Sequence, residues 1–178
     1  MNRKALFLDR DGVINVDSGY VHKIEDFQFL DGIFDICRLA CAKGYIIVVI
    51  TNQAGIGRGY YNVSDFNTLT KWMCKKFAAE NISISKVYFS PCHPKHGLGH
   101  YKKNDYLRKP NPGMIVKAVE EFDLNLEASV LIGDKITDIK AGTSAGVGTN
   151  ILLSASEDVI DEGAYFRAFD LYEAADYL

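Results

Sequence analysis

The 178-residue chain is predicted to adopt an α/β fold, a three-layer α/β/α sandwich built around a parallel, Rossmann-like sheet. Short apolar runs typical of strands buried on both faces recur along the sequence, and segments with helical periodicity separate most of them. With 48% hydrophobic residues, the chain is long enough to bury one core and rather short for two. We therefore expect a single domain over residues 1–178, without a large cap domain.

Five segments are expected to form the strands of this sheet. Each is a short apolar run, and the runs lie at residues 5–8, 45–50, 87–89, 130–132 and 150–153. Because parallel neighbours need a crossover connection, helical segments between successive runs favour a parallel sheet. The stretch at about 90–107 is irregular, and a loop of that length is more often functional than incidental.

Helical periodicity predicts two helices in the first half of the chain. The first is expected to have Asp31 as its N-cap and to end at Gly44, and the second is expected to follow Ser64. Their apolar faces are most simply core. These faces are formed by Ile33, Ile36, Cys37, Ala40 and Cys41 in the first helix, and by Phe66, Leu69, Met73 and Phe77 in the second.

A third helix has a clear start, with Asn111 as the expected N-cap and Pro112 in the first turn. Its N-terminus lies just after Lys109. Because free backbone amides and the helix dipole both favour an anion, a helix N-terminus beside a lysine is a natural phosphate site. The apolar face of this helix is formed by Met114, Ile115, Ala118, Val119 and Phe122.

Two aspartates, Asp9 and Asp11, directly follow the first expected strand and are followed by Gly12. In parallel sheets, ligands collect where the strands end. Residues two apart in an extended chain can point the same way, so both carboxylates could face one ligand. Two anions held together repel each other, so the pair predicts a bound metal ion or a shared proton.

Three further segments place polar groups where strands end or helices begin. The second strand runs into Thr51-Asn52-Gln53, which offers a hydroxyl and two amides that can donate to phosphate oxygens. Arg108-Lys109-Pro110 supplies positive charge, and a later strand ends in a second acidic pair, Asp134 and Asp138. An isolated Asp-x-Asp is usually a structural turn, but the four segments in this order supply what phosphoryl transfer needs.

These segments resemble the haloacid dehalogenase (HAD) superfamily of phosphohydrolases across nearly the whole chain. A narrower resemblance, to the bacterial heptose 1,7-bisphosphate phosphatases, is carried by residues 9–15, 19–21 before Phe27, 51–53, 55–59 and 108–110. The resemblance implies an Mg²⁺-dependent phosphoric monoester hydrolase that removes the 7-phosphate of this sugar through an aspartyl phosphate. Such a step belongs to ADP- or GDP-heptose biosynthesis for a surface polysaccharide such as lipopolysaccharide.

The resemblance also implies roles for individual residues. Asp9 would be the nucleophile, and Asp11 would protonate the leaving oxygen and then take a proton from water. Mg²⁺ would be held by Asp9, Asp134 and the backbone carbonyl of Asp11. The remaining groups act on the phosphate: Lys109 would neutralise it, Thr51 with Asn52 would orient it, and Asp138 would bond to Lys109 or Thr51.

Arg58 and Arg108 are the best candidates for contacting the substrate beyond the reacting phosphate, because guanidinium groups suit a second phosphate or paired hydroxyls. Either could instead be a solvated surface arginine, and Lys135 could likewise be a surface residue. The other expected substrate contacts are Asn52, Gln53, Gly19 and Tyr20.

The glycines of residues 55–59 allow a second interpretation, as a dinucleotide fingerprint. That motif requires a helix that opens on a pyrophosphate and an acidic residue further on, whereas these glycines lead into Tyr60-Tyr61-Asn62. We expect instead a flexible loop near the entrance of the site.

Many relatives in this family carry a structural zinc in the long loop, bound by a Cys-x-His and a Cys-x-Cys pair. Here the two pairs read Ser90-Pro91-Cys92 and Asp105-Tyr106-Leu107. Leucine cannot bind zinc and serine is a poor ligand, so we expect a zinc-free loop held by Tyr101 and Tyr106. The alternative is an improvised zinc site, with ligands from Cys92, His93, His96, His100 and Asp105.

The net charge of −3 and the pI near 5.8 give no general attraction to nucleic acid or to an anionic membrane. The N-terminus passes directly into a strand, so we expect neither a signal peptide nor a membrane span, and a cytoplasmic location. The expected partner is a small sugar phosphate, bound by a monomer.

Three other functions remain open. Histidinol-phosphate phosphatases share the core and the loop, but their cationic substrate would prefer carboxylates at the rim, whereas the arginines and Gly19-Tyr20-Val21 favour an anionic sugar. Polynucleotide 3′-phosphatases share the Thr-Asn-Gln turn, but binding a nucleic acid calls for a basic track, and this chain is acidic. A catalytically silent binding module could keep the same fold.

Overall fold

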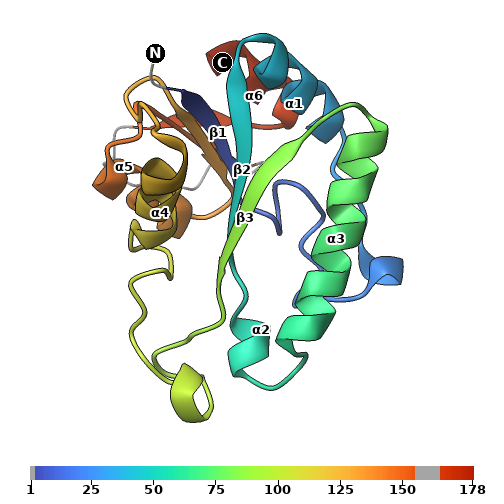
Figure 1. Ribbon diagram of the computed structural model, residues 1–178, viewed down its shortest axis with the longest axis vertical. Helices are drawn as coiled ribbons and strands as arrows, with labels where there is room; N and C mark the ends of the chain where they lie inside the picture. Colours follow the sequence, from blue (N-terminus) through green and yellow to red (C-terminus); the bar gives the residue numbers. More distant parts are fainter. Residues whose placement is uncertain (1–2, 155–164) are drawn as a thin grey trace.

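The computed structural model describes residues 3–154 and 165–178, and in it six parallel strands form one sheet in the order β3-β2-β1-β4-β5-β6 (Figure 1). The five expected strands are confirmed, each with slightly wider bounds, while the short edge strand β6 was not predicted. The strands are β1 (Lys4–Leu8), β2 (Tyr45–Asn52), β3 (Ile84–Ser90), β4 (Val130–Gly133), β5 (Thr149–Leu153) and β6 (Phe166–Ala168).

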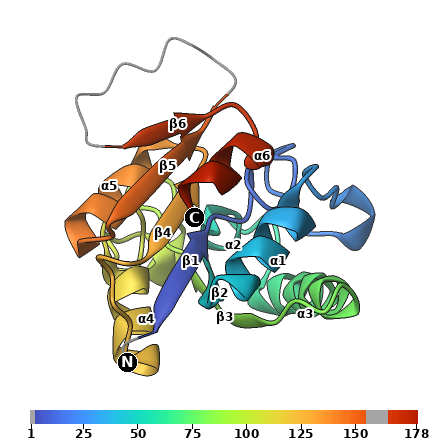
Figure 2. The same cartoon turned by 90° about the horizontal axis from the view of Figure 1, so that it is seen from above.

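Helices cover both faces of the sheet, which confirms the three-layer α/β/α architecture (Figure 2). In Figure 2, α4 and α5 lie on one side, and α1, α3 and α6 lie on the other. The helices are α1 (Ile33–Ala42), α2 (Ala54–Gly57), α3 (Val63–Ala79), α4 (Gly113–Phe122), α5 (Ile136–Ala145) and α6 (Leu171–Ala174). Short 3-10 helices lie at Ile24–Asp26, Gly99–Tyr101 and Ala175–Tyr177.

The central strand β1 is buried on both faces, as its uninterrupted apolar sequence predicts. Leu6 and Leu8 pack in the core cluster that contains the apolar faces of α1 and α3. Ala5 and Phe7 point the other way, because side chains alternate along a strand, and they pack in the cluster beneath α4 and α5. Packing on both faces therefore fixes the position of β1 and, with it, the position of the residues that directly follow the strand.

Two helices begin differently from the prediction. The residue before α1 is Gly32, with a φ of 80° and no side-chain cap, so the prediction of Asp31 as N-cap is wrong. The helix α3 begins before Ser64, because Asn62 and Asp65 form a capping box in which each side chain accepts from the other residue's amide.

The start of α4 also differs. Pro112 occupies the N-cap position and α4 begins at Gly113, so the predictions of Asn111 as N-cap and of Pro112 in the first turn are wrong. The side chain of Asn111 instead donates to the carbonyl oxygen of Asp105, at 3.0 Å. This contact ties the start of α4 to the end of the long loop.

The order of the strands creates a topological switch point beside β1. From β1 the chain builds outward through β2 to β3 on one side, and from β4 through β5 to β6 on the other. In open parallel sheets, ligands bind at the carboxyl ends of the strands that flank such a point. Most of the candidate site residues lie in the segments that follow β1, β2 and β4, while Arg108 and Lys109 lie between β3 and α4.

Among the described residues, no helix has the length and apolar character that crossing a membrane requires.

Candidate active site

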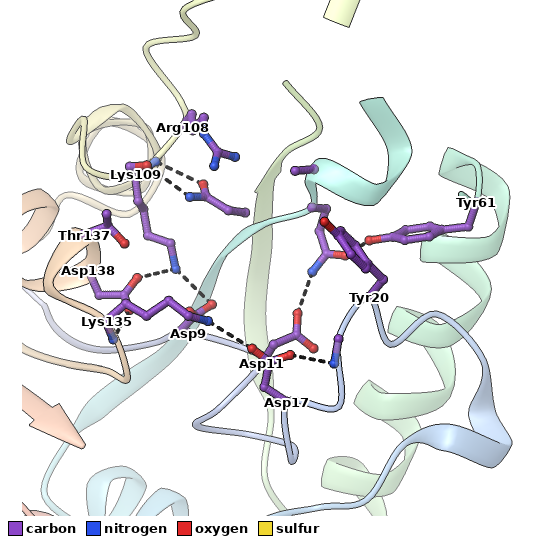
Figure 3. Close-up of a pocket in the computed structure, with 14 residues that line it drawn as sticks. Asp9, Asp11, Asp17, Tyr20, Tyr61, Arg108, Lys109, Lys135, Thr137 and Asp138 are labelled. Atoms are coloured by element: carbon purple, nitrogen blue, oxygen red, sulfur yellow. Dashed lines mark hydrogen bonds and ion pairs between the residues drawn. The ribbon is translucent and has the colours of Figure 1, made fainter. Parts of the chain in front are cut away.

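A crevice of about 360 Å³ opens where β1, β2 and β4 end (Figure 3). Most of the predicted site residues line it, although they come from separate segments of the chain. Three predicted residues, Thr51, Arg58 and Asp134, lie outside this lining. The lining residues are Asp9, Asp11, Asp17, Gly19, Tyr20, Asn52, Gln53, Ala54, Tyr61, Arg108, Lys109, Lys135, Thr137 and Asp138.

Lys109 lies at the centre of the acidic side of the crevice and is only 2% exposed (Figure 3). Its Nζ lies 2.9 Å from Asp9 Oδ1 and 2.6 Å from Asp138 Oδ1, and it donates to the carbonyl oxygen of Ile50 at 2.9 Å. All three ammonium hydrogens therefore have acceptors. Burial disfavours the charge, but Asp138 and Asp9 together raise the pKa of Lys109 above its ordinary value. The charged lysine holds both carboxylates in place.

Asp9, Asp134 and Asp138 each bring a carboxylate oxygen within 4.8 Å of the others. Within residues 3–154 and 165–178, no other three acidic, histidine or cysteine side chains form such a group. Burial, reinforced by Asp138 and Asp134 and opposed by Lys109, raises the pKa of Asp9 to about 8. Asp134 Oδ1 is buried without a hydrogen-bond partner. Excess negative charge and an unpartnered oxygen fit a hard divalent cation such as Mg²⁺.

Gly12 allows the acidic residues that follow β1 and β4 to approach each other. Its φ of 91° is a backbone conformation that favours glycine, and a Cβ at this position would lie 2.3 Å from Asp134 Oδ2. A side chain there would strain the backbone and displace the carboxylate. The glycine after the first acidic pair is therefore part of the geometry of the cluster.

Asp11 faces the opposite side of the crevice. Its Oδ1 accepts from Arg10 at 2.8 Å and from Asn15 at 3.0 Å, and its Oδ2 accepts from Gln53 Nε2 at 3.0 Å. Arg10 is only 1% exposed and also donates to the Val21 carbonyl oxygen at 2.6 Å. The Asp11 side chain is thus balanced by a buried guanidinium and lies outside the carboxylate cluster, while its carbonyl as a metal ligand stays a prediction.

The polar groups at the end of β2 bond mainly to the protein. Gln53 Nε2 donates to Asp11 and, at 2.8 Å, to Thr51 Oγ1, so neither amide hydrogen remains for the substrate, contrary to its predicted role. Asn52 donates to the carbonyl oxygen of Lys109 at 3.1 Å and accepts from its amide at 3.0 Å. Asn52 therefore fixes the backbone of Lys109. The Thr51 hydroxyl accepts from Gln53, and its contact with a phosphate oxygen stays a prediction.

Two arginines lie together near the rim. The guanidinium of Arg58 lies 5.6 Å from the centre of the Tyr20 ring, and Arg108 donates to the Cys92 carbonyl oxygen at 3.0 Å. Burial and the nearby charge of Arg58 lower the pKa of Arg108. Neither forms a salt bridge to a carboxylate of the described chain. The pair is therefore a local excess of positive charge.

Lys135 connects the two sides of the crevice. Although its side chain is 54% exposed, its Nζ lies 3.0 Å from Asp17 Oδ2 and 3.1 Å from Asp134 Oδ2. Asp17 also accepts from the Gly19 amide at 3.1 Å. Asp17 was not predicted as a site residue, yet it links the loop that carries Gly19 and Tyr20 to the residue after Asp134.

Residues 54–57 form the single helical turn α2, so the prediction of a flexible loop there is wrong. Gly55 and Gly57 are buried. A Cβ at Gly55 would lie 2.1 Å from the Tyr61 ring, and one at Gly57 would lie 2.4 Å from the Pro91 carbonyl oxygen. These glycines therefore permit close packing around the site.

Hydrogen bonds to the Asp105 carboxylate connect the two ends of the long loop. Asp105 Oδ2 accepts from Ser90 Oγ at 2.8 Å, Asp105 Oδ1 accepts from the Leu107 amide at 3.3 Å, and the Cys92 thiol also bonds to the carboxylate. His93 Nδ1 faces two backbone amides. Ser90, Cys92 and Asp105 thus bond to one another, and the absence of zinc from the loop stays a prediction. In the part of the chain that the structure describes, the four candidates do not converge as ligands: Cys92, His93, His96 and His100.

The two tyrosines expected to hold this loop behave differently. Tyr101 packs against the buried cluster of Ile56, Tyr61 and Phe66. Tyr106 is 59% exposed, although its carbonyl oxygen accepts from the Gly113 amide at 3.2 Å, so its role as an anchor of the loop stays a prediction.

Several residues of the site were not predicted from the sequence. Arg10 could have been suspected, because a basic residue between two aspartates can supply a buried counter-charge. Tyr61, Asp17 and Thr137 line the crevice only because distant segments fold together, and no local pattern marks them.

Comparison with known proteins agrees with this arrangement. Residues 106–167 match the family model described as HAD-hydrolase-like. The D-glycero-α-D-manno-heptose-1,7-bisphosphate 7-phosphatase of Burkholderia mallei is 59% identical over 153 residues, covering 86% of this chain and 81% of the relative. The corresponding β-anomer 7-phosphatase of Vibrio cholerae is 43% identical over 163 residues, covering 92% and 88%.

A solved structure shares the whole architecture. The D,D-heptose 1,7-bisphosphate phosphatase of B. bronchiseptica, complexed with magnesium and phosphate, superposes with a TM-score of 0.83 at 25% identity, covering 98% of this chain and 97% of that one. The fold and the site thus define the class, the phosphohydrolases of the HAD superfamily. The sequence identities to the two named relatives extend over most of each aligned chain and define a narrower family. The chain belongs to the D-glycero-D-manno-heptose-1,7-bisphosphate 7-phosphatase family.

Proposed function

We propose that this chain removes the 7-phosphate of D-glycero-D-manno-heptose 1,7-bisphosphate, with Asp9 as the nucleophile. The observation that carries the proposal is the Asp9 carboxylate at the switch point, 2.9 Å from the buried Lys109 and clustered with Asp134 and Asp138. The names of the relatives support the substrate. The product would enter the synthesis of a nucleotide-activated heptose.

The geometry around Asp9 supports its proposed role in the first displacement. Its Oδ1 accepts from the Arg10 amide at 2.7 Å and from Lys109, which fixes the carboxylate and leaves Oδ2 as the attacking atom. The bond from Oδ2 to phosphorus forms while the bond from phosphorus to the sugar oxygen breaks. Asp11 enters this step with a proton taken up from water and gives it to that oxygen, so the sugar leaves as a neutral alcohol.

The second displacement restores the enzyme. The Asp11 carboxylate, now without its proton, takes one from a water molecule whose oxygen bonds to phosphorus. The bond between phosphorus and Asp9 breaks, and inorganic phosphate leaves. A bound Mg²⁺, held by Asp9 and Asp134, would neutralise the negative charge that both displacements concentrate at the phosphate. The Thr51 hydroxyl donates to a phosphate oxygen.

Arg58 and Arg108 supply a site for the second phosphate of the substrate. The charges of the two guanidinium groups repel each other, and Asp105 offsets only part of the positive charge of Arg108, so an anion between the arginines is favoured. Arg58 Nε is also buried without a hydrogen-bond partner. This excess of positive charge favours a bisphosphate over the cationic substrate of a histidinol-phosphate phosphatase.

The test is phosphate release from the heptose 1,7-bisphosphate in the presence of Mg²⁺, with identification of the phosphate that remains. We expect the 1-phosphate to remain, and we expect faster turnover of the α-anomer, because the more identical relative carries that name. Preferred hydrolysis of histidinol phosphate, or loss of the 1-phosphate, would contradict the proposal.

The rim arginines are tested with two substrates. We expect Arg58→Ala and Arg108→Ala to raise KM for the bisphosphate by roughly tenfold, because each loses a charge-assisted contact, and to leave KM for heptose 7-phosphate unchanged. Arg38→Ala is the control, since Arg38 pairs with exposed Asp35 and Glu80 away from the crevice. Equal effects on both substrates would exclude a second phosphate at this position.

A further inference from the structure

Tyr61 lines the crevice but has no role in the reaction described above. Its hydroxyl donates to Gln53 Oε1 at 2.5 Å, and it is only 8% exposed. Burial raises its pKa to about 12, so the phenol keeps its proton at neutral pH and remains a donor. The Tyr61 hydroxyl is thus the hydrogen-bond donor to the side-chain oxygen of Gln53.

The Tyr61 ring is held from two sides. The imidazole of His22 stacks on it with a centroid distance of 4.8 Å and an interplanar angle of 1°. On another side, the backbone of Gly55 approaches so closely that a Cβ there would lie 2.1 Å from the ring. His22 is itself held through Nδ1, which lies 2.8 Å from the carbonyl oxygen of Tyr20. The phenolic hydroxyl therefore has little freedom to move away from Gln53 (Figure 3).

A fixed hydroxyl at this position selects one orientation of the Gln53 amide. With Oε1 toward Tyr61, Nε2 donates to Asp11 Oδ2 at 3.0 Å and to Thr51 Oγ1 at 2.8 Å, and the amide is satisfied. Rotation of the amide by half a turn would place Oε1 against the Asp11 carboxylate, where two acceptors repel. Without the Tyr61 hydroxyl, Oε1 would lose its donor in a buried position, and other orientations would compete.

We propose that Tyr61 is a positioning residue for the acid–base group Asp11, and that it acts by fixing the orientation of the Gln53 amide. The inference rests on the proposed role of Asp11. It concerns proton transfer to the leaving oxygen, which depends on a hydrogen-bond geometry between Asp11 and the substrate. The Gln53 amide contributes to that geometry by holding Asp11 Oδ2 from the side of β2.

The test compares two leaving groups. A sugar alkoxide needs a proton as it leaves, whereas a nitrophenolate leaves readily without one. We expect Tyr61→Phe to lower kcat/KM, which reports the step in which the leaving group departs, by roughly tenfold on the heptose bisphosphate, a part of the about 10²–10⁴ that acid–base catalysis supplies. On nitrophenyl phosphate we expect less than about a twofold loss.

Tyr172→Phe is the matched control, because it removes a hydroxyl that pairs with the exposed carboxylate of Asp31, at 3.2 Å and away from the crevice. We expect its kcat/KM to be unchanged on both substrates. A thermal melt of each variant shows whether it is folded. Gln53→Leu removes the same connection at its centre, and we expect it to show the same dependence on the leaving group, so the proposal stays testable if Tyr61→Phe does not fold.

A double-mutant cycle separates positioning from packing. In an Asp11→Asn background, Tyr61→Phe should cause no further loss on the heptose bisphosphate, because the group that it positions is gone. Equal losses of Tyr61→Phe on both leaving groups, or an undiminished loss in the Asp11→Asn background, would overturn the positioning role. If Asp11→Asn itself shows no dependence on the leaving group, the proposed role of Asp11 fails and this inference fails with it.

Discussion

The two sides of the crevice balance their charges in opposite ways. On the side of β4, the three clustered carboxylates face two lysines: Asp9 and Asp138 pair with the buried Lys109, and Asp134 pairs with Lys135 but has no hydrogen-bond partner at Oδ1. On the side of β2, Asp11 accepts from the side chains of Arg10, Asn15 and Gln53. One side has more negative charge than the protein neutralises, and the other is balanced by its own donors.

This difference separates two tasks of phosphoryl transfer. A site with excess negative charge attracts a cation, which in turn neutralises the phosphate, so we propose that the metal binds between Asp9 and Asp134. An acid–base group must instead be held in one orientation, and the donors around Asp11 do this without a metal. Asp9 and Asp11 are only two residues apart, yet their surroundings differ, in agreement with the different steps proposed for them.

The largest expected effect comes from Asp9→Asn on the crowded side. We expect phosphate release to fall by about 10⁴-fold or more, because the nucleophile is lost. In the absence of metal, we expect thermal stability to be unchanged or higher, since one of several crowded carboxylates is removed while Lys109 keeps Asp138. A phosphate-release assay and a thermal melt check both results, and a strongly destabilised variant would contradict the account of excess charge.

Asp11→Asn on the balanced side is expected to behave differently. Turnover should fall by about 10²–10⁴-fold, the contribution of acid–base catalysis. Stability should fall by about 1–3 kcal/mol, because the buried Arg10 loses its anionic partner. Denaturant melts measure the second effect. If this variant and Asp9→Asn change stability by the same amount in the same direction, the contrast between the two sides is wrong.

Magnesium should act mainly on the crowded side. Mg²⁺ at about 100 times its Kd stabilises a folded protein by ~2.7 kcal/mol, so we expect a higher Tm with the metal and a smaller increase in Asp134→Asn. The pKa of Asp9 is raised to about 8 in the metal-free protein, so the stability contributed by its protonated form is lost as pH rises toward 8. Because Mg²⁺ binds the deprotonated carboxylates, its effect on Tm should be larger at pH 8 than at pH 6.

An equal increase in Tm with Mg²⁺ at pH 6 and pH 8 would show that metal binding does not compete with protonation of the carboxylates. An equal shift in Asp134→Asn and the unmodified protein would remove Asp134 from the metal site.

The smallest expected effect lies in the long loop, which leads to Lys109. Ser90→Ala removes the hydrogen bond from Ser90 to Asp105, and we expect a loss of about 1 kcal/mol and a Tm lower by roughly 2–4 °C. Dialysed protein should contain well below one zinc per chain. Near-stoichiometric zinc by elemental analysis would instead assign the loop to a metal.

The sheet and the acidic groups of the site could be predicted because their signals are local. The apolar run of β1 fixes a buried strand, and Asp9 directly follows it, so its place at the strand end needs no knowledge of the rest of the fold. Asp134 could be added because the ends of parallel strands meet at one edge of the sheet, and Lys109 because it lies just before the start of a helix.

The features that were missed depend on contacts between distant segments. The contact of Gln53 with Asp11 depends on an amide orientation that Tyr61 selects. The glycines of residues 55–59 look like a flexible loop in sequence, but Tyr61 and Pro91 pack against them. Asn111, expected to cap α4, bonds instead to a carbonyl of the long loop.

The central claim, that Asp9 becomes covalently phosphorylated, can be tested by chemical trapping. Enzyme mixed with Mg²⁺ and the heptose bisphosphate is quenched during turnover and treated with borohydride, which reduces an acyl phosphate to an alcohol, and the peptides are then sequenced by mass spectrometry. We expect homoserine at position 9 only when substrate is present, and none in Asp9→Asn. Unmodified Asp9 during normal turnover, or a trapped residue elsewhere in the chain, would contradict it.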